Sequence, residues 1–138
     1  MLKKIHQLST FIENKIGRLA AVTDVLAKND INIHAMSVYD STEFNIFRFI
    51  TDEPYKALEM LKKEGYVVRM TEVVVVEPLD KPGTMNRIFH LLADHNISIN
   101  YLYPYAVTDA PYMLIMSTTD KERTLELIRE SGLSNIDE

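Results

Sequence analysis

The sequence predicts an α+β protein that consists of two copies of a βαββαβ unit. Three observations support this prediction. A shift of 66 positions lays residues 15–19 on residues 81–85 with similar residue types. In both copies, the hydrophobic spacing alternates between the strand period and the helix period in the same order. Of the 138 residues, 46% are hydrophobic and only nine are Gly or Pro, which excludes a disordered or collagen-like chain.

The internal repeat extends over most of each copy. Matching hydrophobic pairs are Val22 with Ile88, Leu26 with Leu92, Ile31 with Ile97, Ile33 with Ile99 and Tyr39 with Tyr105. Beyond that point the second copy needs two additional residues, which a hairpin turn of different length explains. Two copies are too few for a solenoid, so we interpret the chain as a fused pair of domains, residues 1–71 and 72–138.

The elements of the first copy follow from its residue pattern. In chain order we expect a strand at 8–12, a helix from 17 to the break at 29, strands at 33–39 and 44–51, a helix at 54–65 and a strand at 67–70. Gly17 opens the first helix, in which Leu19, Val22 and Leu26 recur at helical spacing. Pro54 is tolerated in the first helical turn, and Gly65 ends the second helix.

The second copy predicts the same order of elements. We expect strands at 73–77, 99–106 and 112–118, helices at 83–95 and 121–131, and a weak last strand at 133–136 that is short or missing. The order βαββαβ is that of the ferredoxin-like unit, an antiparallel sheet with helices on one face. This fold supports many unrelated functions, so the loops must indicate which one applies.

Composition excludes several classes of function. The net charge is −5, from 15 basic and 20 acidic residues, which disfavours a nucleic-acid partner. The absence of cysteine excludes disulfides, thiolate metal sites and thiol catalysis. No apolar run approaches the roughly 18 residues of a membrane span, and no signal-peptide pattern is visible. We therefore expect a soluble, cytoplasmic protein without a membrane partner.

The loop before the first helix of each copy is built to receive an anion. Residues 13–17 (ENKIG) and 79–83 (LDKPG) both end in glycine, which permits a tight turn and close approach of a ligand. The unpaired N–H groups of the following helix attract an anion such as a carboxylate. Asn14 can donate and accept, whereas ionised Asp80 only accepts. The alternative is that Asn14 and Asp80 are ordinary helix caps.

These loops resemble a family pattern. Residues 14–19 (NKIGRL) with 30–33 (DINI), and residues 80–83 (DKPG) with 96–99 (NISI), resemble the (D/N)-x-P-G-x-L … G-I-N-I pattern of ACT domains. The resemblance covers nearly the whole chain, twice. The departures are Ile16 for proline, Asp30 and Asn96 for glycine, and Ser98 for asparagine. A tandem pair of this kind is similar to small stand-alone ACT regulators and, more distantly, to the regulatory small subunit of acetolactate synthase.

The resemblance implies an amino-acid sensor. ACT domains commonly pair side by side and bind a free amino acid at their interface, with the first loop of one copy and the G-I-N-I asparagine of the other. We expect one site to combine Asn14 and Gly17 with Ser98, and a second, unequal site to combine Asp80 and Gly83 with Asn32. The candidate ligand-binding residues are Asn14, Lys15, Ile16, Gly17, Arg18, Leu19, Asn32, Asp80, Pro82, Gly83, Thr84, Met85, Ser98 and Tyr103.

Tyr103 belongs to a run of alternating tyrosines, with Tyr101 and Tyr105, that projects from one sheet face. These rings could wall a ligand pocket or serve ordinary sheet packing. Among the four histidines only His90 and His95 are close, and a separation of five residues is not a one-face helical spacing, so no metal site is expected.

Enzyme motifs are absent, since no catalytic triad order, phosphate loop, dinucleotide fingerprint or metalloprotease helix occurs. Residues 44–49 also lack the basic-glycine start of an RNA-recognition motif. We therefore predict a non-catalytic regulatory protein without cofactors, which senses an amino acid and passes its occupancy to its own homo-oligomer or to an enzyme of amino-acid metabolism. The alternative is a constitutive regulatory subunit that senses no ligand and whose loop glycines serve only as turns.

Overall fold

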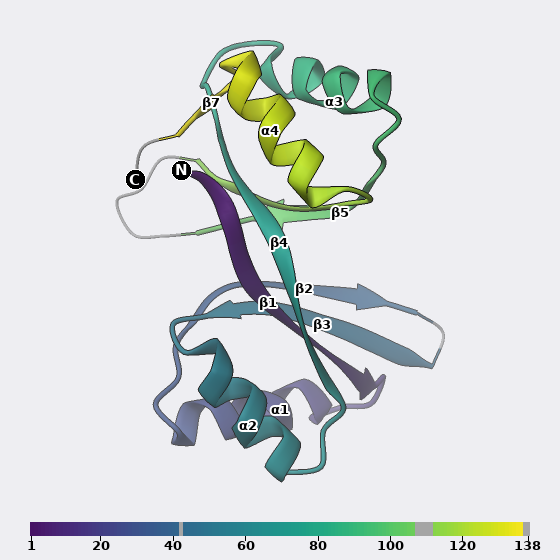
Figure 1. The fold of residues 1–138 in the computed structure, drawn as a ribbon. Coiled ribbons are helices and arrows are strands. Elements are labelled where there is room, and N and C mark those ends of the chain that lie inside the picture. The colour runs from purple at the N-terminus through teal and green to yellow at the C-terminus, as the bar shows by residue number, and fades with distance from the viewer. Residues whose placement is uncertain (42, 107–111, 137–138) are drawn as a thin grey trace. The chain divides into compact units, whose positions relative to one another are not determined.

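The computed structural model describes residues 1–41, 43–106 and 112–136 (Figure 1). Within this part of the chain, the elements in order are β1 (Leu2–Glu13), α1 (Arg18–Lys28), β2 (Ile33–Asp40), β3 (Phe44–Thr51), α2 (Pro54–Lys63), β4 (Val68–Pro78), α3 (Thr84–Asp94), β5 (Ile99–Pro104), β6 (Leu114–Thr118), α4 (Lys121–Ser131) and β7 (Ser134–Asn135). Residues 107–111, 137 and 138, which we assigned to the second repeat, lie outside the described residues. The α+β class with antiparallel pairing is confirmed.

The chain forms two compact units. One consists of His6–Thr71, and the other of Met1–Ile5 together with Glu72–Glu138. These units differ from the repeats expected from sequence in the placement of the first five residues. The reason is the length of β1, which begins at Leu2 rather than near residue 8.

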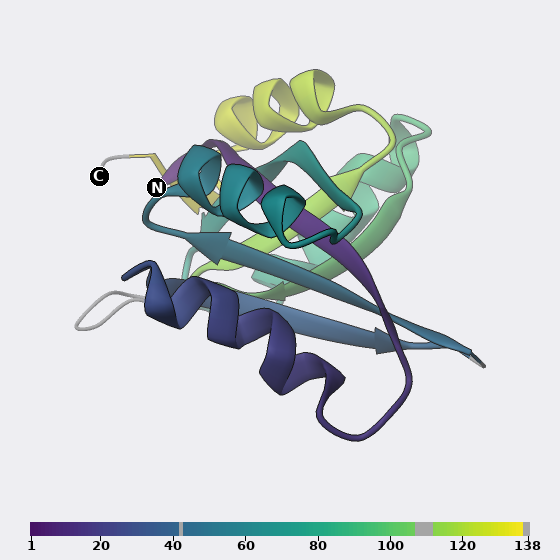
Figure 2. The same ribbon diagram turned by 90° about the horizontal axis from the view of Figure 1, so that it is seen from below.

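The unit of His6–Thr71 carries two helices on one face of an antiparallel sheet, as Figure 2 shows for α1 and α2. Its strands lie in the order β2-β3-β1-β4. Leu8 pairs with Phe49, and the stacked rings of Phe47 and Phe49 are fully buried. Burying such a ring contributes about 1.5–3 kcal/mol, so this cluster anchors the helices to the sheet.

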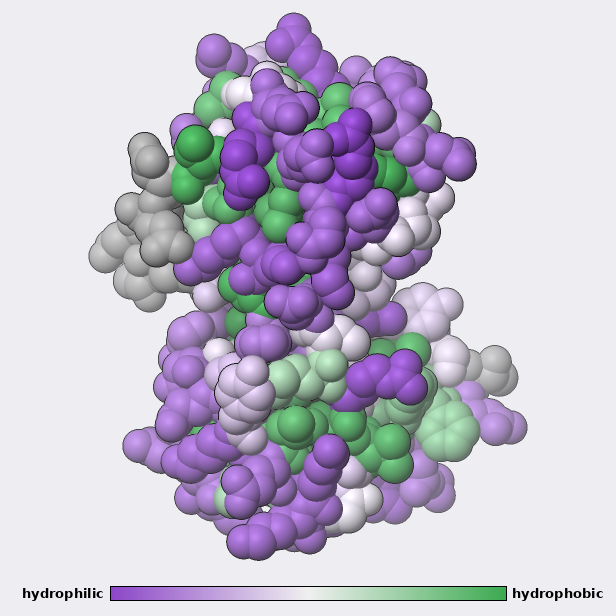
Figure 3. Space-filling model, viewed as in Figure 1, coloured by the Kyte–Doolittle hydropathy of each residue, from purple (hydrophilic) through white to green (hydrophobic). Residues whose placement is uncertain are grey.

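The second unit repeats this arrangement with α3 and α4. Its strands lie in the order β1-β4-β6-β5, and the two-residue strand β7 pairs with the end of β4. Leu2 is 5% exposed and belongs to the same core cluster as Val76 and Ile128. The outer surface of α4 is predominantly hydrophilic (Figure 3), which matches its buried face of Leu125, Leu127 and Ile128. The expectation of a short last strand is confirmed.

One expectation about the strands is wrong. Residues 67–70 and 73–77 were expected to form two strands, yet Val68–Pro78 is a single continuous strand. The intervening Thr71 and Glu72 contain no turn-forming glycine, proline or asparagine, so nothing interrupts the extended backbone. This strand carries the chain directly from the first repeat into the second.

No helix within the described residues is long and apolar enough to span a membrane.

Candidate functional site

Both repeats present a helix that starts directly after a left-handed glycine. Gly17 precedes α1 with φ 85°, and Gly83 precedes α3 with φ 88°. A residue with a Cβ rarely adopts this conformation, although no atom lies within 4 Å of where the Cβ would stand at either glycine. The glycines are therefore required by backbone geometry and not by crowding. Neither helix has a side-chain cap. The alternative that Asn14 and Asp80 serve as ordinary helix caps therefore does not apply, and their role in ligand binding stays a prediction.

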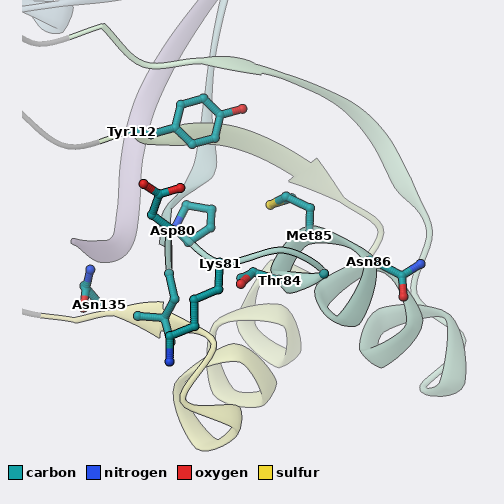
Figure 4. Close-up of a pocket in the computed structure, with 10 residues that line it drawn as sticks. Asp80, Lys81, Thr84, Met85, Asn86, Tyr112 and Asn135 are labelled. Carbon is teal, nitrogen blue, oxygen red and sulfur yellow. The ribbon is translucent and has the colours of Figure 1, made fainter.

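The second repeat has a surface pocket of about 530 Å³ at the start of α3. It is lined by Pro78, Leu79, Asp80, Lys81, Gly83, Thr84, Met85, Asn86, Tyr112 and Asn135. In Figure 4 the Asp80 carboxylate points toward the ring of Tyr112, whereas the Lys81 chain extends in the opposite direction. The Met85 thioether and the Thr84 hydroxyl are directed toward the side of the pocket where Asp80 and Lys81 lie. Charged, hydroxyl and apolar residues thus line one cavity, and the side chains of Asp80 and Lys81 extend in opposite directions from it.

The polar side chains of this pocket differ in their partners: that of Asn135 hydrogen-bonds to the Glu77 carboxylate, whereas three others have none in the described part of the chain. Among the described residues, no hydrogen bond or ion pair engages the side chains of Asp80, Lys81 or Thr84. Thr84 is only 5% exposed, so most of its side chain is removed from water. The Thr84 hydroxyl is not among the fully buried side-chain atoms that lack a partner, so it is accessible from the pocket.

In the corresponding loop of the first repeat, the polar side chains form ion pairs and a hydrogen bond within the same repeat. Lys15 Nζ lies 3.0 Å from Glu13 Oε2, and Arg18 Nη2 lies 4.0 Å from Glu13 Oε1. Asn14 Nδ2 donates to Asp40 Oδ1 at 3.3 Å. Hydrogen bonding from Lys15, with the nearby charges of Lys15 and Arg18, holds the pKa of Glu13 below its ordinary value. Both cationic side chains of this loop therefore already pair with Glu13 within the protein, although they stay 66% and 51% exposed.

Two smaller pockets flank this first loop. One, of about 280 Å³, includes Arg18, and the other, of about 470 Å³, includes Asn14 and Lys15. Glu13 and Phe44 line both pockets. Glu13 thus lines two pockets of the first repeat.

The remaining predicted residues are distributed over both units. Ile16 and Leu19 are exposed, as is Pro82, which lies beside its pocket without lining it. The backbone N–H of Asn32 donates to Asp52 Oδ1 at 3.0 Å, and that of Ser98 donates to Thr119 Oγ1 at 3.0 Å. The two G-I-N-I-like segments therefore share the same local anchoring.

Asp30 and Asn96, which stand where the family pattern has glycine, keep a backbone conformation typical of glycine. Asp30 has φ 59° and Asn96 has φ 61°, the left-handed region where glycine is usual. Asparagine and aspartate tolerate this region better than other residues. The family pattern is thus preserved in backbone conformation where it is lost in residue type.

Tyr103 is placed away from the pocket. It is 5% exposed on β5, and its ring stacks with that of Tyr101 at 6.4 Å. It does not line the pocket of the second repeat. This placement favours the packing interpretation of the alternating tyrosines.

Several residues that line this pocket were not among the predicted ligand-binding residues, and Tyr112 and Asn135 lie farthest from the predicted loop in the sequence. Tyr112 could have been found, because the repeat alignment places it opposite Phe44, which lines the pockets of the first repeat. Asn135 is the second residue of the two-residue strand β7, and no spacing in the sequence marks it. In the part of the chain that the structure describes, no group of three or more His, Asp or Glu residues could hold a metal ion.

Comparison with known proteins decides the family. The model of an ACT domain pair matches residues 3–138. This chain belongs to the ACT domain family. The match to a pair of domains agrees with the two repeats, each of which has a left-handed glycine at the start of its first helix.

Solved structures resemble this ACT pair over most of its length. Protein BT0572 from Bacteroides thetaiotaomicron shares 31% sequence identity with a TM-score of 0.86, and the match covers 96% of this chain and 92% of that one. The ligand-free regulatory subunit of aspartate kinase from Thermus thermophilus shares 18% identity with a TM-score of 0.63, covering 91% of each chain. The corresponding subunit from Thermus flavus shares 16% identity with a TM-score of 0.61, covering 96% and 95%. At these lower identities the likeness shows the fold.

No curated protein matches the sequence.

Proposed function

We propose that this ACT pair is a non-catalytic regulatory protein that binds a free amino acid at an interface between ACT repeats. The observation that carries the proposal is the pocket at the start of α3, which Asp80, Lys81 and Thr84 line without a hydrogen-bond or ion-pair partner among the described residues. Charged groups of both signs beside helix N–H groups suit the zwitterion of an amino acid.

The proposed output is regulation of a partner. Two of the similar structures are regulatory subunits of aspartate kinase, which favours an enzyme of amino-acid metabolism as the partner. The proposed setting is the cytoplasm, where free amino acids and such enzymes meet. We also propose a homo-oligomer, because units of about 65–70 residues form marginal cores and gain stability from association.

The proposed mechanism is linkage between two binding events. A ligand that prefers one arrangement of the repeats stabilises that arrangement. A partner that also prefers it is then bound more tightly, by the same factor with which the partner tightens ligand binding. No covalent step is needed.

A thermal-shift screen of the twenty L-amino acids tests this proposal. At one hundred times the dissociation constant, a ligand stabilises the folded state by about 2.7 kcal/mol, which corresponds to a rise in Tm of roughly 5–15 °C. The D-enantiomer of the same amino acid is the control and should give no comparable shift. If none of the twenty raises the Tm, the chain is instead a constitutive regulatory subunit.

A further inference from the structure

The Thr84 hydroxyl is the feature of the second-repeat pocket that calls for a ligand. Thr84 is 5% exposed as a residue, its hydroxyl faces the pocket in Figure 4, and no described residue hydrogen-bonds to it. The hydroxyl lies on the first residue of α3, beside unpaired backbone N–H groups. A carboxylate at this position would accept hydrogen bonds from both kinds of donor.

The charges that line this pocket complement one zwitterion. Asp80 and Lys81 are its only ionised residues, and the other lining residues are neutral. The Asp80 carboxylate with the adjoining Tyr112 ring offers a place for an ammonium group. Lys81 and the start of α3 offer a place for a carboxylate. A third charge, on the ligand's side chain, would find no counter-charge in the pocket.

The first repeat already holds an anion at the equivalent position. Glu13 occupies the position of Leu79 in the repeat alignment, and its carboxylate pairs with Lys15 and Arg18. Arg18 occupies the position of Thr84 and is exposed. A ligand carboxylate would have to displace Glu13 to reach these cations. The second repeat offers no such competitor, because Leu79 is apolar.

From these observations we propose that each chain binds one amino acid with an uncharged side chain, in the pocket of the second repeat, while Glu13 keeps the first loop closed to ligand. This inference rests on the proposed function and specifies both its ligand class and the repeat that binds it.

Isothermal titration of the wild-type chain with each of the twenty L-amino acids gives the first test. We expect the tightest binding from an amino acid with an uncharged side chain, at one molecule per chain. Aspartate, glutamate, lysine and arginine should bind at least tenfold more weakly. Tightest binding by one of these four, or two equal sites per chain, would overturn the inference while leaving amino-acid sensing intact.

Two variants of Thr84 test the hydroxyl, titrated with the amino acid that binds wild type most tightly. Thr84→Val keeps the shape and removes the donor, so we expect affinity to fall about tenfold. Thr84→Ser retains the hydroxyl and should restore affinity to within about threefold of wild type. Equal affinity of Thr84→Val and wild type would overturn the inference.

The closed first loop is tested with Glu13→Gln, which removes the internal anion. We expect a second, weaker site to appear, so that the stoichiometry rises toward two. Glu59→Gln, an equal charge change on an exposed position of α2, should leave one site. A Glu13→Gln variant that remains folded by circular dichroism and still binds one molecule would show that Glu13 does not close the loop. Absence of any amino-acid binding to wild type would instead overturn the proposed function itself.

Discussion

The loops before α1 and α3 share their backbone and differ in their chemistry. Gly17 and Gly83 have nearly the same left-handed conformation, and both helices lack a side-chain cap. Around Gly17 the polar side chains pair with one another, whereas around Gly83 they face a cavity without partners. The two repeats thus share one backbone geometry at the helix start, while the residues beside the glycine give the two loops different polar contacts.

The strongest way to break this comparison is to disturb each glycine in turn. Gly83→Val and Gly17→Val should each destabilise the fold by about 1–3 kcal/mol, because both force a β-branched residue into left-handed conformation. Urea denaturation should show similar losses for the two variants. Only Gly83→Val is expected to abolish the amino-acid-induced rise in Tm. Equal loss of ligand response in both would mean that the two loops are functionally equivalent.

A smaller change makes the second loop resemble the first. Asp80→Asn introduces the amide that Asn14 supplies in the first repeat and removes the charge proposed to meet the ligand's ammonium. We expect affinity to fall about tenfold to a hundredfold, as for loss of a charged hydrogen bond, measured by calorimetry. Asp94→Asn, the same change at an exposed position near the end of α3, provides the control and should bind as wild type does.

A carboxylate equivalent to that of Glu13 can also be introduced into the second loop. Leu79→Glu places a carboxylate beside Lys81, as Glu13 stands beside Lys15. Because exposed ion pairs are weak, the expected loss of affinity is about fivefold. Leu79→Gln, which has a similar shape without the charge, separates this effect from lost apolar contact. Binding equally weakened in both variants would attribute the effect to packing.

The smallest effect concerns acid stability. The pKa of Glu13 is lowered from its ordinary value of 4.5 in the folded state, so its ion pairs stabilise the fold above that value and are lost as pH falls through the lowered pKa. Since Glu13 is exposed, the contribution is small. Urea denaturation between pH 5 and pH 3 should show a slightly shallower loss of stability for Glu13→Gln than for wild type. An NMR titration of the Glu13 carboxyl should place its pKa below 4.5.

Much of the fold follows from sequence because its signals are local. Gly17 and Gly83 mark the helix starts, and the hydrophobic spacing between Val22 and Leu26 identifies a buried helix face. Strand β4 was divided because its middle lies where two repeats meet, and a repeat boundary suggested a turn that Thr71 and Glu72 do not form. A strand continues where no turn-forming residue interrupts it, and hydrophobic periodicity does not report the absence of such residues.

The candidate site was less accessible to sequence reasoning. Thr84 was among the expected residues, yet its burial without a hydrogen-bond partner depends on tertiary packing. Glu13, Lys15 and Arg18 lie within six positions, but which of them pair depends on the path of the loop. Asn135 reaches the pocket from the far end of the chain, where only the pairing of β7 with β4 brings it near.

The long strand β1 has a consequence for dissecting this protein. Residues Met1–Ile5 belong to the same compact unit as Glu72–Glu138, and Leu2 is buried in the core of that unit. A fragment cut at the repeat boundary, containing residues 72–138 alone, would lack this strand segment and expose the apolar surface that Leu2 covers. An autonomous piece of the second repeat should therefore include residues 1–5 as well as residues 72–138. Fragment complementation with a peptide of residues 1–13 would be the natural way to recover it.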